Sequence, residues 1–293
     1  MLGTKTKLNV LVLCGLFLFI DTAAYASDEL LMGIFPRRNS TATIKMFTPL
    51  AKYLEIELNQ KVKVQTAKNF PTFWKKVQSR EYDIAHFNQV HYILSHKNFG
   101  YHVFAKNEEF DRSELRPTLV VRKDSGIETV ADLKGKSIAF GGGRLAMISY
   151  IGVKRILQNS GLGDLDYKST IAKNPPNAAM AVYFKKADAS GIGDVVLRLP
   201  SIQKKIEIGE LKVLARGGSQ PHITWAANSK LGKAKIEKIQ NAFLGLNDSE
   251  DGKKILKKAV LTGILSAHDS EYNISRSIYK RYKKWNEESE SNK

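Results

Sequence analysis

The first hundred residues after the N-terminal segment alternate between two hydrophobic patterns. Short apolar or alternating runs, bounded by polar turns, are typical of strands. The segments between them carry apolar residues every three or four positions, which is typical of helices that pack on one face. The predicted strands are 30–35, 61–65 and 82–87, and the predicted helices are 43–58, 69–79 and 90–96. This alternation predicts a parallel sheet covered by helices.

A second block with the same alternation is predicted to be inserted into the first. Further strands are expected at 101–105, 116–122, 136–140, 167–171, 187–192 and 211–215, and further helices at 144–157, 177–184, 233–246, 251–260 and 272–285. The chain would cross between the blocks near Val121 and Ala215. We therefore predict an α/β fold of two Rossmann-like lobes joined by a two-crossing hinge. Residues 27–121 and 217–293 would form lobe 1 and residues 122–216 lobe 2, and such pairs close on a ligand.

A glycine turn between a strand and a helix is the strongest local signal for a site. The strand 136–140 is followed by three glycines that allow a tight turn, and apolar spacing predicts a helix from Arg144. Main-chain N–H groups and the positive end of the dipole at such a helix start favour an anion, and Arg144 adds a guanidinium. The turn matches neither glycine motif for nucleotides, so a tight turn with an exposed arginine is the alternative interpretation.

Ligands of parallel sheets bind beyond the carboxyl ends of the strands, so residues there are the candidate ligand contacts. They are Arg37, His86, Phe87, Asn88, Gln89, Gly142, Gly143, Arg144, Leu145, Asn174, Asn177 and Asp194. Arg37 has the alternative of a solvated surface charge, and Asp194 that of a helix N-cap. Asn174 and Asn177 flank two prolines, where a rigid loop is the alternative.

The formal charge of +17 requires anionic partners to be considered. The lysines are scattered over nearly every segment without a dense basic run, so we expect a small anion rather than nucleic acid. Four histidines, at positions 86, 91, 96 and 102, do not share a helix face and lack a carboxylate to complete a metal set. We therefore expect no metal and no cofactor. Hydrolase motifs such as G-x-S-x-G and H-E-x-x-H are absent, which argues against an enzyme.

The first 26 residues have the pattern of a secretory signal peptide. Two lysines precede the apolar run 8–20, and Ala24-Tyr25-Ala26 provides a small-x-small cleavage site. Cleavage after Ala26 would deliver the protein to the periplasm, although retention of the segment as an anchor remains open. The single cysteine, Cys14, lies inside this segment, so the mature chain would contain no disulfide.

Five segments, taken in order, match the pattern of one protein family. They are P-L-A-K-Y-L at 49–54, Y-D-I-A-H-F at 82–87, D-L-K-G-K-S-I-A-F at 132–140, N-A-A-M-A-V at 177–182 and A-D-A-S-G-I-G-D at 187–194. With them the chain resembles the phosphate, phosphite and phosphonate solute-binding proteins of bacterial ABC transporters. The resemblance covers nearly the whole mature chain. It implies the type II periplasmic binding protein fold, with a phosphoryl group held at the helix start after Phe140.

The chain also departs from this family pattern. The departures are the lack of a hydroxyl between Gly143 and Ser149, Phe87 in place of a family tyrosine, and Pro221-His222 in place of an acid before Trp225. The family acid at Asp194 is kept. Because such acids suit an amino group in the family, an aminoalkylphosphonate fits this chain poorly. Main-chain N–H groups and Arg144 still suit an oxyanion.

From these patterns we expect a monomeric periplasmic protein that captures a small phosphonate-, phosphate- or phosphite-like oxyanion between its lobes for ABC-type uptake. Its partner would be an ABC permease that recognises the closed form. Two alternatives stay open on sequence alone. One is a periplasmic receptor that presents its closed form to a membrane signalling protein, and the other is an enzyme on the same scaffold.

Overall fold

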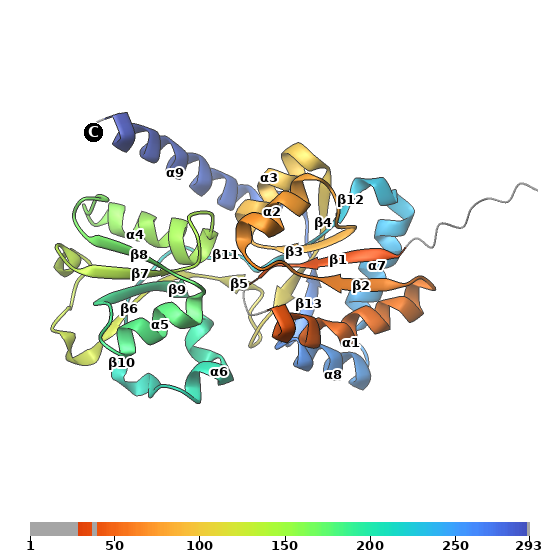
Figure 1. Ribbon diagram of the computed structural model, residues 1–293, viewed down its shortest axis with the longest axis horizontal. Coiled ribbons are helices and arrows are strands. Elements are labelled where there is room, and N and C mark those ends of the chain that lie inside the picture. Colours follow the sequence, from red (N-terminus) through yellow and green to blue (C-terminus); the bar gives the residue numbers. More distant parts are fainter. Residues whose placement is uncertain (1–28, 37–39, 292–293) are drawn as a thin grey trace, which may run out of the picture.

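Two α/β lobes lie side by side in the computed structural model, which describes residues 29–36 and 40–291 (Figure 1). The predicted signal segment 1–26 and the candidate contact Arg37 lie outside the described residues. Within those residues, no helix combines the length and apolar character needed to cross a membrane. Each lobe is built around one main sheet with helices on both faces.

Lobe 1 contains a six-stranded sheet in the order β13-β4-β12-β3-β1-β2. Its strands are β1 (Leu30–Ile34), β2 (Val62–Gln65), β3 (Ile84–Phe87), β4 (Tyr101–Glu108), β12 (Thr224–Asn228) and β13 (Gly263–Ser266). The first three pair in parallel, as the βαβαβα pattern predicts. β12 returns from much later in the chain and runs antiparallel between β3 and β4.

Helices cover both faces of this sheet. They are α1 (Ser40–Leu58), α2 (Phe70–Gln78), α3 (Gln89–Phe99), α7 (Lys233–Gly245) and α8 (Glu250–Lys258). α1, α7 and α8 pack on one face, where the Trp225 ring lies 5.9 Å from Phe47 and 4.8 Å from Phe243. α2 and α3 pack on the other face, where Phe73 stacks on Tyr82 at 5.2 Å. α3 follows β3 after a single residue, so its start lies at the end of that strand.

Lobe 2 contains a five-stranded sheet in the order β10-β6-β9-β7-β8. Its strands are β6 (Pro117–Arg122), β7 (Ser137–Gly141), β8 (Lys168–Ala172), β9 (Ala189–Gly193) and β10 (Leu211–Arg216), and its helices are α4 (Val153–Asn159), α5 (Pro175–Tyr183) and α6 (Pro200–Gln203). Successive side chains of a strand face opposite sides. Accordingly Ile138 and Phe140 pack with α4, whereas Ala139 packs with α5.

The hinge is a short two-stranded ribbon between the lobes. β5 (Glu114–Leu115) pairs antiparallel with β11 (Gln220–Pro221) where the chain crosses (Figure 1). The predicted crossings near Val121 and Ala215 therefore need correction. β6 belongs to the second sheet because both of its edges are paired, one with β9 and the other with β10.

The C-terminal helix α9 (Asn273–Ser291) joins the lobes at a further place. It starts beside Tyr272, which is buried in lobe 1, and extends to lobe 2 beside α4 (Figure 1). Ile278 and Tyr282 join the core of lobe 2 there. The prediction that the whole C-terminal segment belongs to lobe 1 is therefore wrong, because the apolar face of this helix is long enough to reach both cores.

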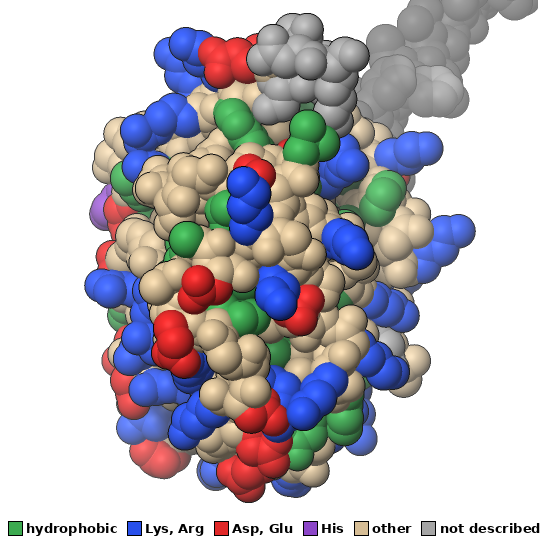
Figure 2. All heavy atoms as spheres, turned by 90° about the vertical axis from the view of Figure 1, so that its left-hand side faces the viewer, with side chains coloured by type: hydrophobic (Ala, Val, Ile, Leu, Met, Phe, Trp, Pro, Cys, Tyr) green, Lys and Arg blue, Asp and Glu red, His purple; other side chains and the backbone are tan. Residues whose placement is uncertain are grey.

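Charges of both signs are interspersed on the end of lobe 2 that Figure 2 shows. Surface ion pairs of lobe 2 include Lys185 with Asp124 at 3.1 Å and Lys134 with Asp166 at 3.8 Å. This face is not a continuous basic patch, which agrees with the scattered lysines of the sequence.

Lys154 is a buried charge between α4 and α9. Its Nζ lies 5.1–5.7 Å from the ring centroids of Phe140, Tyr150, Tyr167 and Trp285, and it donates a hydrogen bond to the Asp164 carboxylate. Burial lowers the pKa of Lys154, and the bond to Asp164 opposes this. The ion pair with Asp164 lies within lobe 2, and Lys154 contacts α9 through the Trp285 ring.

We expect Asp164→Ala to destabilise the protein by about 3 kcal/mol, because it leaves the buried Lys154 charge without its partner. Urea-induced unfolding measures the change. Asp251→Ala is the control, because it removes an ion pair with Lys254 that is exposed on both sides and should have little effect. Equally small effects of the two substitutions would contradict the role given to the buried pair.

Candidate ligand-binding site

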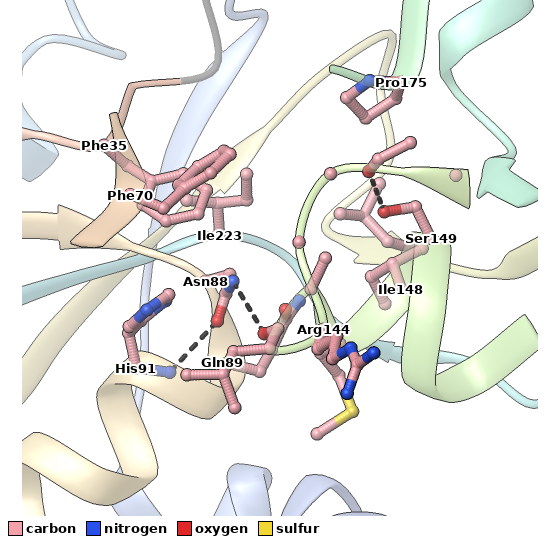
Figure 3. A pocket seen from close by; sticks show the side chains of 18 of the residues that line it. Phe35, Phe70, Asn88, Gln89, His91, Arg144, Ile148, Ser149, Pro175 and Ile223 are labelled. Atoms are coloured by element: carbon pink, nitrogen blue, oxygen red, sulfur yellow. Dashed lines mark hydrogen bonds between the residues drawn. The ribbon is translucent and has the colours of Figure 1, made fainter. Parts of the chain in front are cut away.

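A cavity of about 380 Å³ lies where the two lobes and the hinge meet. Lobe 2 contributes the glycine turn and the helix start after it, and lobe 1 contributes the first residues of α2 and α3 (Figure 3). Its volume falls in the range of about 300–1,000 Å³ that is typical of small-molecule sites. The cavity is therefore the candidate binding site.

The glycine turn has the tight geometry that the sequence predicts. Gly142 has φ of +111°, which side-chain-bearing residues rarely adopt. A Cβ atom on Gly141 would lie 2.4 Å from Cα of Pro175, so only glycine permits this approach to the start of α5. These two glycines bring the chain sharply round from β7 toward lobe 1.

The helix after the turn starts later than predicted. Residues 143–146 form a turn in which Ala146 N donates to the Gly143 carbonyl at 2.8 Å, and a π-helical turn, η3, covers Met147–Gly152 before α4. The N–H groups of Tyr150 and Ile151 both bond to the Ala146 carbonyl, and the Ser149 hydroxyl donates to the Gly141 carbonyl. The predicted helix start at Arg144 is therefore wrong by three residues, because apolar spacing does not distinguish a turn from the helix that follows it.

Three main-chain N–H groups at this helix start are available to a ligand. Met147, Ile148 and Ser149 are buried and line the cavity. Within the described chain, no main-chain acceptor pairs with their N–H groups. Buried N–H groups without a partner are rare in native proteins. An anion in the cavity would satisfy them, and the exposed Arg144 beside them adds a positive charge.

Asn88 connects the two lobes at the edge of the cavity. Its Oδ1 accepts the N–H of His91 at 3.0 Å and so caps α3, while its Nδ2 donates to the Leu145 carbonyl of the glycine turn at 3.1 Å. The neighbouring Gln89 donates from Nε2 to the Pro221 carbonyl of the hinge at 2.5 Å. The start of α3 is thus bonded to both lobe 2 and the hinge.

An aromatic wall closes the lobe 1 side. The Phe35 ring lies 4.7 Å from Phe70 and 5.3 Å from His91, and His91 lies 4.9 Å from Trp74. Burial lowers the pKa of His91 to about 3, so its imidazole is neutral near pH 7. Arg144 therefore provides the formal positive charge among the described residues that line the cavity.

The structure brings together only part of the predicted site. Asn88, Gln89, Gly142, Gly143, Arg144 and Leu145 line the cavity, and their role in binding stays a prediction. Phe87 instead packs against Tyr101 and is fully buried, because it is the last residue of β3 and points into the core. His86 faces the opposite side of the sheet, where it lies 4.3 Å from the Trp225 ring and 3.0 Å from the Asn107 amide. Neither of these two residues lines the cavity.

The later candidates serve local structure. Asp194 accepts hydrogen bonds from the Arg112 guanidinium and from Arg116 N, both at 3.0 Å, and so connects the end of β9 to the hinge. It does not line the candidate cavity, and it does not cap the helix that follows. Asn174 caps α5 by accepting the N–H of Asn177 at 2.9 Å. Both prolines and Asn177 belong to α5, so the rigid-loop alternative is wrong as well, and neither asparagine lines the cavity. In the described chain, no group of three or more His, Cys, Asp or Glu side chains is placed to hold a metal.

Phe70, Trp74 and Ile223 are cavity residues that sequence reasoning missed. A usable signal was present for Phe70. Asn69 before Pro71 is typical of a helix N-terminus, and the structure shows Asn69 Oδ1 accepting from Thr72 N at 2.9 Å. A helix that starts there follows β2, so its first residues lie at the carboxyl edge of the sheet, where ligands bind. For Ile223 the signal is absent, because its position depends on the hinge.

Comparison with known proteins agrees with the two-lobed architecture. A family model for the periplasmic substrate-binding protein of phosphonate ABC transporters matches residues 32–272. A solved structure of PhnD1 from Prochlorococcus marinus in complex with methylphosphonate is 16% identical and has a TM-score of 0.76, over 87% of this chain and 98% of that chain. A binding protein component of a phosphonate ABC transporter from Pseudomonas aeruginosa is 15% identical, with a TM-score of 0.74 over 88% and 87%.

A third similar structure is the Xanthomonas citri protein XAC2383 bound to ATP. It is 14% identical, with a TM-score of 0.73 over 89% of this chain and 99% of that chain. At sequence identities of 14–16%, the similarity to these structures shows a shared fold only. The predicted type II periplasmic binding protein fold is confirmed.

The buried His91 should make stability depend on pH. An unfolded histidine has a pKa of about 6.5, so between that value and about 3 the unfolded chain binds a proton that the native protein does not. Stability is therefore lost as the pH falls through this window. When the pH falls from 7.5 to 4.5, the free energy of unfolding should decrease in both proteins. The decrease should be about 2–3 kcal/mol smaller for His91→Gln than for the wild type. Urea unfolding at both pH values measures this.

The same substitution at the exposed His102 is the control and should leave most of the pH dependence in place. If the His91 variant and the wild type lost the same free energy on acidification, His91 would not be a buried neutral group.

Proposed function

The chain belongs to the periplasmic substrate-binding proteins of phosphonate ABC transporters, and we propose that it captures a phosphonate-type oxyanion in the cavity between its lobes. One observation supports this most strongly. The N–H groups of Met147, Ile148 and Ser149 lie in buried residues of the cavity wall and lack a main-chain acceptor in the described chain. Oxyanion oxygens are strong acceptors that would satisfy them.

The charges around the cavity support the same proposal. Arg144 lies three residues before the N–H groups, and no acidic residue is among the described residues that line the cavity. An anion there gains from the guanidinium and from the positive end of the helix without meeting a carboxylate. A cationic ligand would find no counter-charge in the lining.

Ligand capture is coupled to lobe closure through Asn88. Its bond to the Leu145 carbonyl forms only when the two lobes are close together. A ligand that contacts both sides of the cavity binds this closed form more tightly than an open one, and that difference in affinity drives closure. The closed surface is then what an ABC permease would recognise.

Family membership favours transport over the sensory role that the sequence left open. We propose that residues 1–26 direct secretion to the periplasm and are removed, and that the protein acts as a monomer. The sequence pattern of residues 1–26 and the family support the periplasmic location.

A thermal-shift screen of the purified protein against phosphate, phosphite, methylphosphonate, phenylphosphonate and sulfate tests the proposal. An anion that binds only the native form raises the melting temperature as its concentration rises. If none of these anions changes the melting temperature at millimolar concentration, the oxyanion function is wrong.

Replacing Arg144 should weaken binding of whichever anion is found. A lost hydrogen bond to a charged group corresponds to about 1.5–3 kcal/mol, so Arg144→Ala should lower affinity about ten- to hundred-fold by calorimetry. Arg198→Ala, at another exposed arginine of lobe 2 that does not line the cavity, should leave affinity unchanged. Unchanged affinity in the Arg144 variant would refute its assigned role.

A further inference from the structure

The cavity is far more apolar than a phosphate ion requires. We propose that the ligand carries an apolar group, best an aromatic ring, on its oxyanion. This inference rests on the proposed function and names the class of phosphonate: an aryl or bulky alkyl phosphonate, instead of phosphate, methylphosphonate or an aminoalkylphosphonate.

The first support is the continuous aromatic surface on lobe 1. Four rings form a row in which each ring contacts the next, in the order Phe70, Phe35, His91 and Trp74. The centroids of neighbouring rings are 4.7–5.3 Å apart. Figure 3 shows Phe35, Phe70 and Ile223 together on one side of the cavity, with Ile148 on the opposite side beside Ser149. Aromatic rings prefer offset-stacked or edge contacts with another ring, and such a wall offers both.

The second support is the size of the cavity. A volume of about 380 Å³ corresponds to roughly a dozen water molecules in the liquid. A phosphate or methylphosphonate ion held at the N–H groups of η3 would fill only the lobe 2 end. Water would then remain against Phe70, Trp74 and Ile223, which is unfavourable for apolar surface. An apolar substituent directed at lobe 1 would displace that water.

The third support is that the polar side chains of the lining, Arg144 and His91 apart, already make hydrogen bonds within the protein. The Ser149 hydroxyl bonds to the Gly141 carbonyl, and the amide nitrogens of Asn88 and Gln89 donate to the carbonyls of Leu145 and Pro221. Only Oε1 of Gln89 and Nδ1 of His91 are buried there without a partner in the described chain. These two atoms can take a hydrogen bond from the ligand but cannot balance an ammonium charge, so an aminoalkyl group is disfavoured.

Isothermal titration calorimetry on the purified protein tests the ligand class with four probes: inorganic phosphate, methylphosphonate, phenylphosphonate and the uncharged benzyl alcohol. Phenylphosphonate should bind about 40-fold more tightly than methylphosphonate, the gain expected when roughly 90 Å² of extra apolar surface leaves water. Benzyl alcohol should bind much more weakly than phenylphosphonate, because it lacks the group that meets the N–H groups and Arg144.

A matched pair of variants locates the apolar group. Phe70→Ala should weaken phenylphosphonate about ten-fold and methylphosphonate less than two-fold, because only the larger ligand reaches this ring. Phe184→Ala is the control, because Phe184 is 55% exposed and does not line the cavity. It should change neither affinity.

Two other outcomes would overturn the inference in distinguishable ways. Methylphosphonate or phosphate binding as tightly as phenylphosphonate would refute the apolar ligand class while leaving the oxyanion function in place. Binding of benzyl alcohol with no binding of the three anions would refute the oxyanion function and the proposed ligand class together.

Discussion

The hydrogen bond from the Asn88 amide to the Leu145 carbonyl is the contact on which the site depends. It joins the first turn of α3 in lobe 1 to the glycine turn of lobe 2. Asn88 is held in place because it also caps α3, and Leu145 is held in place because the chain turns sharply at Gly142. This contact therefore brings the first turn of α3 and the glycine turn together at the edge of the cavity.

The cavity combines two chemical surfaces. On the lobe 2 side, Arg144 and the N–H groups of Met147, Ile148 and Ser149 favour negative charge. These N–H groups have no main-chain acceptor among the described residues. On the lobe 1 side, the rings of Phe35, Phe70 and Trp74 favour an apolar group of the ligand. The neutral His91 belongs to the apolar side, because its burial lowers its pKa well below the usual range. A ligand that suits both surfaces must have an anionic end and an apolar end, and it would hold the lobes together.

Sequence patterns predicted the architecture better than the site. The alternation of strands and helices, the inserted second lobe and the tight glycine turn follow from local spacing and from the steric freedom of glycine. The exact positions where the chain crosses between the lobes do not follow from local spacing. They depend on the pairing of β6 with β9 and β10, which are distant in sequence. α9 likewise reaches lobe 2 through contacts that a single helix pattern does not specify.

Within the candidate site, the edge rule for parallel sheets selected loops that line the cavity, but only some of the side chains that it selected there do so. It placed the start of α3 and the glycine turn at the cavity. It did not reveal that Phe87 points into the core, that Asp194 pairs with Arg112, or that Ile223 reaches the cavity from the hinge. Side-chain direction at a strand end changes with a shift of one residue, and the hinge partners lie about a hundred residues apart.

The central claim is that main-chain N–H groups at one helix start hold the anionic end of the ligand. Backbone amide NMR during titration with phenylphosphonate tests it most directly. The account predicts that the largest shift changes occur at Arg144 to Ser149, with smaller ones at Asn88 and Gln89. Saturable shifts confined to residues outside the cavity, with these amides unmoved, would contradict it.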